Sequence, residues 1–434
     1  MHPLAKELNE IIQSGNHHIY EMLSELGKNL YFPKGILSQS AEAKKLAHKY
    51  NATIGVATEN GQPMYLPSAL KYFNNLEPKD LFFYAPASGI PELRQVWKEK
   101  IIQENPQLQK KAFSHPIVTN ALTHGLSIVA DLFADPHDKL ILPDKLWGNY
   151  KLIFGVRKKV DIEYYPFYKE NGGFNLTGFQ ETLEKCSAAG KLLIILNFPN
   201  NPTGYAISQS EAKKLVEILQ NIAKNGCNII PIMDDAYFGL FYEEETLRES
   251  LFGYLADLDK RILAVKIDGA TKEEFVWGFR VGFITFASAN TPNEVYAALE
   301  RKVMGAIRGN ISNCAHPSQT VVLRILKSPT FRQEQQAKFE LLKSRAQEVK
   351  KVLNNSKYQE VWNVYPFNSG YFMCLQLKTV NAEKLRTHLL EKYGIGIIAI
   401  NETDVRIAFS CLELNQIQDL FEQIYLAIKD LEPN

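Results

Sequence analysis

Polar residues of different chemical kinds follow three candidate strands of this sequence. The loops run over residues 197–204 (NFPNNPTG), 234–237 (DDAY) and 268–272 (DGATK), and Arg280 follows Lys272 by eight residues. In an open parallel sheet, ligands bind beyond the carboxyl ends of the strands. We therefore expect an amide, a carboxylate, an amine and a guanidinium group to meet at one edge of a sheet.

A helix predicted over residues 122–133 adds an anion-binding element. Its apolar residues recur at helical spacing, and Thr123 lies at its N-terminus, where backbone N–H groups bind anions. Pyridoxal phosphate needs a lysine for a Schiff base, a carboxylate at its pyridine nitrogen, a donor to its phenolic oxygen and a phosphate site. It would use all of these groups together, so the sequence predicts pyridoxal phosphate as the cofactor.

The pattern of the segments that must position these loops indicates alternating strands and helices. Residues 192–196 (LLIIL) form a short apolar run typical of a strand covered on both faces. The next segment has apolar residues at a 3.6-residue period, and Ser208 with Glu211 predicts a capping box at its start. Further strands are expected at 228–233 and 261–267. A strand, a helix and a strand at this spacing predict a parallel sheet.

The pattern changes in the C-terminal part of the chain. A charged helix is predicted over 329–356. After it, short strands alternate with two helices; the strands are expected near 371–376, 395–400 and 404–409, and the helices near 381–391 and 412–429. This order of elements predicts a smaller α+β domain.

The predicted fold class is therefore α/β, with a large domain whose mostly parallel sheet is flanked by helices and a smaller α+β domain beside it. The expected boundaries are 1–15 for an N-terminal arm, 16–64 and 342–434 for the small domain, and 65–341 for the large cofactor-binding domain. The stretch before about residue 64 is expected to pack against the small domain.

The composition argues against several other classes of protein. The 434 residues include 49 Lys and Arg against 48 Asp and Glu, a net charge of +1, so no partner nucleic acid or acidic membrane is expected. The charged N-terminus lacks the apolar core of a signal peptide, and no apolar run is long enough to span a membrane. The five cysteines form no CxxC motif and the nine histidines show no ligand spacing. We expect no metal site and a cytoplasmic location.

The polar loops also resemble those of a known family. The runs NFPNNPTG, DDAY and ATKEEFVWGFRVGF are similar to those of fold-type I pyridoxal-phosphate aminotransferases, the class that includes aspartate and aromatic amino-acid aminotransferases. The resemblance extends from about Ile54 to Arg406. It rests on several motifs in the expected order and at the expected separations.

The resemblance implies roles for the residues around the cofactor. Lys272 corresponds to the Schiff-base lysine, which would also move the proton between Cα and the cofactor. The other cofactor contacts implied are Asp234 at the pyridine nitrogen, Tyr237 and Asn201 at the phenolic oxygen, Arg280 and Thr123 with the N–H groups near Ala121 and Leu122 at the phosphate, and Trp147 stacked on the ring.

The resemblance also implies substrate contacts and a partner. Val405, Ile407 and Phe409 share one strand face, so Arg406 points to the other, and it resembles the arginine that binds the substrate α-carboxylate. Gly55 resembles the segment that closes over the substrate. Tyr84 resembles the tyrosine that reaches the phosphate of a partner subunit, and Arg308 the arginine that crosses to bind a side-chain carboxylate. These matches imply a homodimer with shared active sites.

One position departs from the family pattern. Three residues before the lysine the family commonly has a serine whose hydroxyl binds phosphate, and this sequence has Gly269 there. The phosphate site then lacks one donor unless Thr271, a backbone N–H group or His124 replaces it.

The predicted function is an aminotransferase that moves an amino group between an L-amino acid and a 2-oxo acid by a ping-pong mechanism, with a dicarboxylic or aromatic donor. A β-eliminating lyase on the same fold is the alternative, because a fold does not determine the reaction. A non-catalytic DNA-binding relative is disfavoured by the presence of Lys272 and by the lack of a basic extension. The donor stays open, since Arg308 could instead simply end a helix, where a cation is favourable.

Overall fold

The computed structural model describes residues 1–33, 35–170 and 172–432. Its large sheet has the strand order β4-β10-β9-β8-β7-β5-β6. The strands are β4 (Ile117–Asn120), β5 (Lys139–Pro143), β6 (Asp161–Tyr165), β7 (Lys191–Leu196), β8 (Asn228–Asp234), β9 (Ala264–Gly269) and β10 (Val281–Ala287). The pairs from β9 through β6 are parallel, and β10 runs antiparallel to β4 and β9. The predicted mostly parallel sheet is confirmed.

Strand β7 shows why the sheet is buried on both faces. Leu192, Ile194 and Leu196 belong to one apolar cluster, and Leu193 and Ile195 belong to the other. Successive side chains of a strand point to opposite faces, so an unbroken apolar run requires a helical layer on each side. The first layer contains α7 (Pro91–Glu104), α9 (Leu176–Cys186), α10 (Gln209–Lys224), α11 (Leu251–Leu255) and α13 (His316–Leu326), and the second contains α8 (Ala121–Phe133) and α12 (Asn293–Asn310).

Local signals set the ends of these elements. The predicted capping box begins α10: Ser208 Oγ accepts from the Glu211 N–H at 3.2 Å, and Glu211 Oε2 accepts from the Ser208 N–H at 2.8 Å. Strand β9 begins three residues later than predicted, at Ala264. The Arg261 N–H donates to Asp259 Oδ1 at 2.8 Å, which holds residues 259–261 in a turn.

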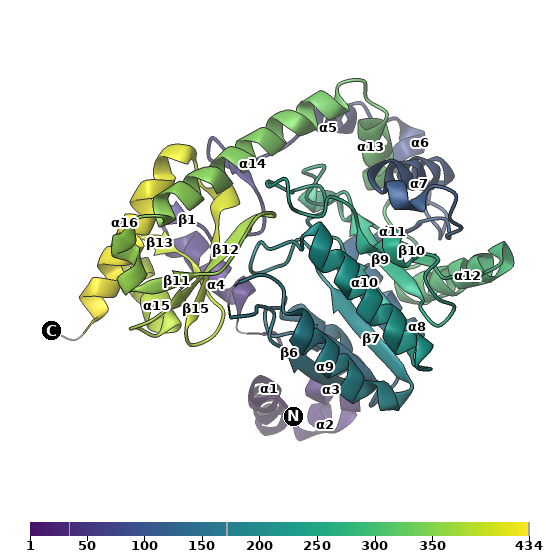
Figure 1. The fold of residues 1–434 in the computed structure, drawn as a ribbon, viewed down its shortest axis with the longest axis horizontal. Coiled ribbons are helices and arrows are strands. Elements are labelled where there is room, and N and C mark those ends of the chain that lie inside the picture. Colours follow the sequence, from purple (N-terminus) through teal and green to yellow (C-terminus); the bar gives the residue numbers. More distant parts are fainter. Residues whose placement is uncertain (34, 171, 433–434) are drawn as a thin grey trace.

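The small domain is built on a second sheet, with the order β11-β12-β15-β14 (Figure 1). Its strands and helices are β11 (Trp362–Val364), β12 (Phe372–Leu377), β14 (Ile398–Ala399), β15 (Asp404–Ala408), α14 (Phe331–Leu353), α15 (Ala382–Tyr393) and α16 (Leu414–Leu431). The strand predicted over 395–400 is two strands: β13 (Ile395–Gly396) pairs with β1 (Tyr50–Asn51), and β14 pairs with β15. The predicted strand is divided because its two halves pair with different strands.

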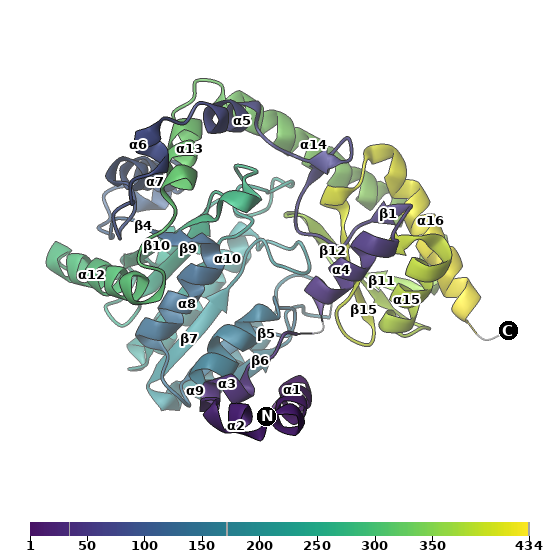
Figure 2. The ribbon, with the colours of Figure 1, turned by 180° about the vertical axis from the view of Figure 1, so that it is seen from behind.

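The N-terminal segment has two parts. Helix α4 (Ile36–Leu46) and β1 contact α15 and β13 of the small domain. Helices α1 (Pro3–Gly15), α2 (His17–Met22) and α3 (Glu25–Asn29) pack on one another, and the Asn9 amide donates to the Lys28 carbonyl oxygen at 2.9 Å. Figures 1 and 2 show these three helices below β6 and α9 and apart from α4, and from here on we call α1–α3 the arm. Short elements then lead from β1 to α7 of the large domain: β2 (Thr58–Glu59), β3 (Gln62–Pro63), α5 (Pro67–Asn74) and α6 (Pro78–Leu81).

No helix in the described part of the chain is long and apolar enough to cross a membrane. The described residues also contain no group of three or more His, Cys, Asp or Glu side chains arranged to hold a metal ion.

Candidate active site

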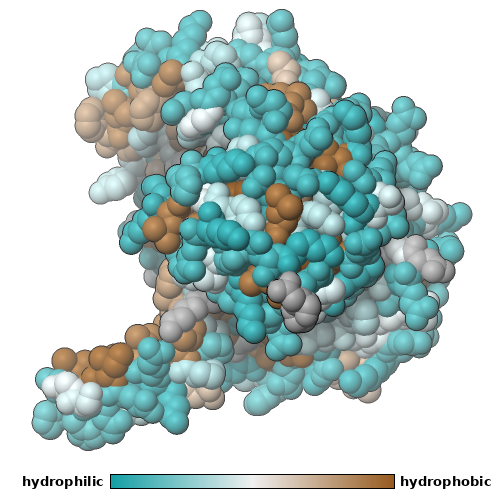
Figure 3. All heavy atoms as spheres, turned by 90° about the vertical axis from the view of Figure 1, so that its left-hand side faces the viewer, coloured by the Kyte–Doolittle hydropathy of each residue, from teal (hydrophilic) through white to brown (hydrophobic). Residues whose placement is uncertain are grey.

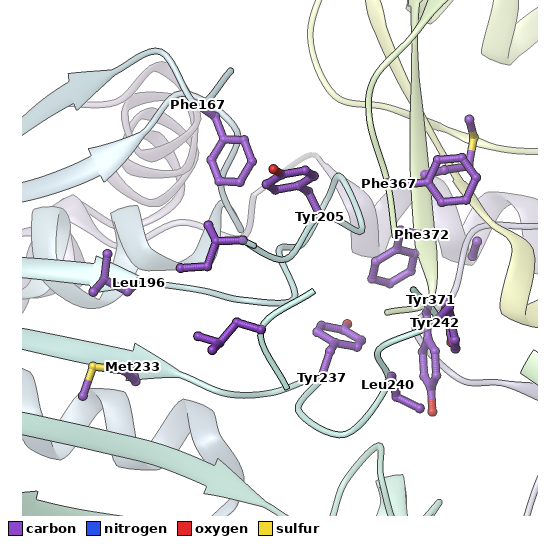
Figure 4. Close-up of a cluster of buried hydrophobic side chains, with 14 of the residues drawn as sticks. Phe167, Leu196, Tyr205, Met233, Tyr237, Leu240, Tyr242, Phe367, Tyr371 and Phe372 are labelled. Atoms are coloured by element: carbon purple, nitrogen blue, oxygen red, sulfur yellow. The ribbon is translucent and has the colours of Figure 1, made fainter. Parts of the chain in front are cut away.

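A cavity of about 380 Å³ lies where the carboxyl ends of the large-sheet strands face the small domain. Figure 4 shows this junction, with Met233 and Tyr237 on the large-domain side and Phe372 on the small-domain side. The predicted residues that line the cavity are Gly55, Ala121, Leu122, Thr123, Trp147, Asn201, Asp234, Tyr237, Lys272, Arg280 and Arg406. A larger groove of about 740 Å³, between α9 and α10, is lined instead by residues such as Lys169 and Lys214.

The carboxylate of Asp234 lies at the end of β8, and the residue is 3 % exposed. Its Oδ2 accepts from the Tyr150 hydroxyl at 2.5 Å, and its Oδ1 accepts from the Ala236 N–H at 3.3 Å. Burial raises the pKa of Asp234 above its ordinary value, against the lowering effects of Tyr150 and Lys272. A buried carboxylate of this kind is stabilised by a cationic partner, and a protonated pyridine nitrogen is one. No sequence pattern identifies Tyr150 as a site residue, because Tyr150 becomes a neighbour of Asp234 only through the fold.

The amine of Lys272 is held in the irregular loop that follows β9. Its Nζ lies 4.9 Å from the centroid of the Tyr237 ring, and the Tyr371 hydroxyl donates to the Lys272 carbonyl oxygen at 3.1 Å. Burial, followed by the nearby Arg280 cation, lowers the pKa of Lys272 to about 8, although Asp234 acts in the opposite direction. A lowered pKa leaves more of the neutral amine, which is the nucleophilic form.

An anion site occupies the side of the cavity formed by the start of α8. Ala121, Leu122 and Thr123 open that helix, and the backbone of Ala121 is left-handed with φ 63°. Arg280 also has a left-handed backbone, with φ 55°, and its guanidinium group donates to the Trp277 carbonyl oxygen at 3.3 Å. A helix N-terminus beside a guanidinium group is suited to a phosphate.

Gly269 lies where neighbouring backbone leaves no room for a side chain. A Cβ atom at this position would lie 2.6 Å from the Val281 carbonyl oxygen and 2.8 Å from Gly282 Cα. The hydroxyl of Thr271 lines the cavity region instead: the residue is 3 % exposed, and Oγ1 has no hydrogen-bond partner among the described residues. His124 Nδ1 accepts from the Asn120 N–H at 3.0 Å, which supports a structural role for its ring.

The opposite side of the cavity carries Arg406 on β15. Its guanidinium group donates to Asn201 Oδ1 at 3.0 Å and to the Thr53 carbonyl oxygen at 2.7 Å, and its Cζ lies 4.1 Å from the centroid of the Phe372 ring. The residue is 2 % exposed, and Nε has no hydrogen-bond partner in the part of the chain described. Such a buried guanidinium group, bonded only to neutral oxygens, is suited to binding a carboxylate from a ligand.

Aromatic side chains complete the walls. Trp147 packs edge-on against Tyr150 with ring centroids 5.4 Å apart, and Trp277 also lines the cavity. Gly55 brings its backbone close to the Tyr237 hydroxyl, which would lie 3.6 Å from a Cβ atom at that position. Trp147, Trp277 and Gly55 therefore line the cavity together with Lys272.

Two predicted residues, Tyr84 and Arg308, lie outside this cavity. Tyr84 is 88 % exposed, and Arg308 is exposed near the end of α12, where it donates to Ser312 Oγ at 2.5 Å. A role for either side chain in an active site requires a second subunit.

Comparison with known proteins assigns this chain to a family. The sequence profile of the aminotransferase class I and II family matches residues 48–424, and the chain belongs to that family. It is 27 % identical over 319 residues to a probable aspartate/prephenate aminotransferase of Aquifex aeolicus, covering 73 % of this chain and 75 % of that one. It is 24 % identical to an aspartate aminotransferase of Sulfurisphaera tokodaii, covering 76 % and 78 %.

The fold is similar to solved aminotransferase structures. An aminotransferase of Anaerococcus prevotii superposes with a TM-score of 0.82 at 22 % identity, covering 93 % of this chain and 98 % of that one. A kynurenine aminotransferase of Pyrococcus horikoshii superposes with a TM-score of 0.78 at 14 % identity, covering 96 % and 99 %. The predicted fold-type I architecture and aminotransferase activity are confirmed, and the relatives named here do not support the lyase alternative.

Proposed function

We propose that this aminotransferase binds pyridoxal phosphate in the cavity described above. The observation that supports this is the meeting of a half-buried amine, a buried carboxylate and an anion site, carried by Lys272, Asp234 and Arg280. The unpartnered hydroxyl of Thr271 fits the same occupant, because a phosphate accepts the hydrogen bond that the protein leaves unmade. When bound, the cofactor supplies an electron-accepting ring that stabilises negative charge at the substrate Cα.

The side chains around that ring have separate tasks. Asp234 would hold a proton at the pyridine nitrogen, and Tyr237 with Asn201 would contact the phenolic oxygen. Thr123, the N–H groups of Ala121 and Leu122, and Arg280 would hold the phosphate, with Thr271 as the donor that Gly269 cannot provide. Trp147 would stack on the ring.

Lys272 and Arg406 would act on the substrate. Arg406 binds the α-carboxylate of an L-amino acid, which places Cα beside the amine of Lys272. That amine, with its lowered pKa, then removes the Cα proton and returns a proton during the same half-reaction. Gly55 allows the N-terminal segment to close over the bound substrate. Water would release a 2-oxo acid, the amino group would stay with the cofactor, and a second 2-oxo acid would accept that group as the steps reverse.

The visible absorption spectrum of the purified protein tests this function. We expect a band from the lysine-bound cofactor that disappears when L-glutamate is added and returns with 2-oxoglutarate. A band that L-glutamate leaves unchanged, but that an aromatic amino acid removes, would assign a different donor. Release of pyruvate and ammonia from a β-substituted amino acid without any oxo-acid acceptor would contradict transamination.

We further propose a cytoplasmic homodimer with shared sites. Phe82, Phe83 and Tyr84 are 81 %, 70 % and 88 % exposed, and Figure 3 shows apolar side chains along the projecting arm at its lower left. Apolar surface of this extent is typical of a protein interface. Free thiols at every cysteine of the described chain suit a reducing compartment.

The choice of donor depends on Arg308. If Arg308 of a second copy reaches the cavity, a dicarboxylic donor is favoured, and otherwise an aromatic or an aliphatic side chain is equally open. We expect Arg308→Ala to lower kcat/KM for L-aspartate more than for L-phenylalanine, by roughly 10- to 100-fold in the ratio, since a lost charged contact costs about 1.5–3 kcal/mol. Arg301→Ala, on the same exposed helix, is the control. An unchanged ratio would assign Arg308 to the end of α12 alone.

A further inference from the structure

A cluster of buried ionic groups lies behind the loop that carries Lys272. Lys100 of α7 is 6 % exposed, and its Nζ lies 2.8 Å from a Glu104 carboxylate oxygen, 2.7 Å from Glu273 Oε2 and 3.4 Å from Glu274 Oε1. Glu273 and Glu274 directly follow Lys272 in the chain. One ammonium group therefore joins α7 to the two residues next to Lys272.

The cluster continues to the carboxyl ends of the neighbouring strands β8 and β9. Lys266 of β9, 2 % exposed, pairs with Asp235, and its Nζ lies 3.3 Å from Asp268 Oδ2. The indole N–H of Trp97 on α7 donates to the same Asp268 oxygen at 3.1 Å. Because Asp235 follows Asp234 and Asp268 precedes the loop of Lys272, these ion pairs brace the segments that carry Asp234 and Lys272.

The ends of the loop of residues 270–276 are anchored: Ala270, Phe275 and Val276 are buried, and the Ala270 N–H donates to the Val281 carbonyl oxygen at 3.2 Å. Between these ends, the Lys272 carbonyl oxygen accepts from the Tyr371 hydroxyl at 3.1 Å and from the Phe275 N–H at 3.3 Å, and the Glu273 carbonyl oxygen accepts from the Gln335 amide at 3.4 Å. It forms no regular strand or helix. Between the anchored ends, the contacts of Glu273 and Glu274 with Lys100 add to a small number of backbone hydrogen bonds.

The positive and negative charges in this cluster are unequal in number. Acidic groups outnumber the two ammonium groups, and neither oxygen of the fully buried Glu274 has a hydrogen-bond partner among the described residues. Burial raises the pKa of Glu274 to about 7, with Glu104 and Asp268 adding to the rise and Lys100 opposing it. Buried ion pairs contribute little net stability, and their best attested use is to specify one arrangement.

We propose that Lys100 is a positioning residue that, through its ion pair with Glu273, fixes the loop of residues 270–276 so that the Lys272 amine faces the cavity. This inference rests on the proposed role of Lys272 toward pyridoxal phosphate. The reactivity of Lys272 would then depend in part on α7, the helix that carries Lys100.

Two matched variants separate this role from simple charge balance. Glu273 and Glu104 have side chains that are 16 % and 17 % exposed, and each contacts Lys100 Nζ, at 2.7 and 2.8 Å. Glu104 lies on the same helix as Lys100, whereas Glu273 lies on the loop. Glu273→Ala removes the tether and Glu104→Ala removes an equal charge without it.

The experiment measures the rate at which the apoprotein gains visible absorbance with pyridoxal phosphate, together with kcat and KM, well below the unfolding temperature. We expect Glu273→Ala to lower that rate and kcat by at least about tenfold, within the roughly 10²-fold that a 1 Å misplacement can cost, with KM little changed. Glu104→Ala should stay within about threefold of the wild type, and Glu273→Gln, which keeps a hydrogen bond to Lys100, should recover most of the loss.

Equal losses in Glu273→Ala and Glu104→Ala would overturn the positioning role, as would a lower unfolding temperature with unchanged rate and kcat. If Glu273→Ala does not fold, Lys100→Arg against Lys100→Met gives the same comparison, and a folded Lys100→Met protein with a wild-type rate would refute the inference. A wild-type protein that gains no absorbance with pyridoxal phosphate would instead refute the proposed function, and this inference with it.

Discussion

Replacing Lys272 with alanine is expected to abolish transamination while the protein stays folded. The loss should reach roughly 10⁴-fold, because a positioned acid–base group contributes about 10²–10⁴-fold and this lysine is also the nucleophile. Far-ultraviolet circular dichroism should match that of the wild type, since the side chain makes no hydrogen bond or ion pair among those found in the described chain. The measurement is kcat/KM for a good donor, together with the visible spectrum.

The pH dependence gives a further check on the same residue. Burial lowers the pKa of Lys272 to about 8. Only the neutral amine is nucleophilic, so the rate of reaction with pyridoxal phosphate should rise with pH through about 8 and level off above it.

Added methylamine should restore part of the activity of Lys272→Ala. Lys98→Ala is a suitable control, because Lys98 lies outside the cavity lining: its Nζ donates to the Phe113 carbonyl oxygen at 3.3 Å and lies 4.6 Å from the centroid of the Phe113 ring. Retained activity in Lys272→Ala would refute the mechanism.

Arg406→Ala should lower kcat/KM for every L-amino acid by roughly 10²–10³-fold, which corresponds to about 3–4 kcal/mol. The guanidinium group is buried against Phe372 and is oriented by Asn201 and Thr53, so its geometry is set before substrate arrives. Losing it removes the partner of the substrate carboxylate from a buried position.

The discriminating measurement compares each amino acid with the amine that lacks its carboxylate. The wild type should strongly prefer the amino acid, and Arg406→Ala should lose most of that preference. Arg406→Lys keeps the charge but not the planar fork, so an intermediate loss is expected. A variant that still prefers the amino acid as strongly as the wild type would assign carboxylate binding to another group.

Much of this protein could be predicted from local patterns. The apolar run of β7, the capping box of α10 and the alternation on β15 each depend on residues close in sequence, so their periods and spacings were sufficient. The loops after β7, β8 and β9 could likewise be placed together, because parallel strands present their carboxyl ends at one edge.

Other features depend on contacts between segments far apart in the chain. The hydrogen bond from Tyr150 to Asp234, the tight approach of β10 at Gly269 and the ion pair between Lys100 and Glu273 each join separate elements. The division of residues 395–400 between two sheets also followed from their partners rather than from their own pattern. The sequence by itself determined which chemical groups the site contains and the strands that carry them. Tertiary structure decided their burial and their orientation, because desolvation and ion pairing arise only when distant segments pack together.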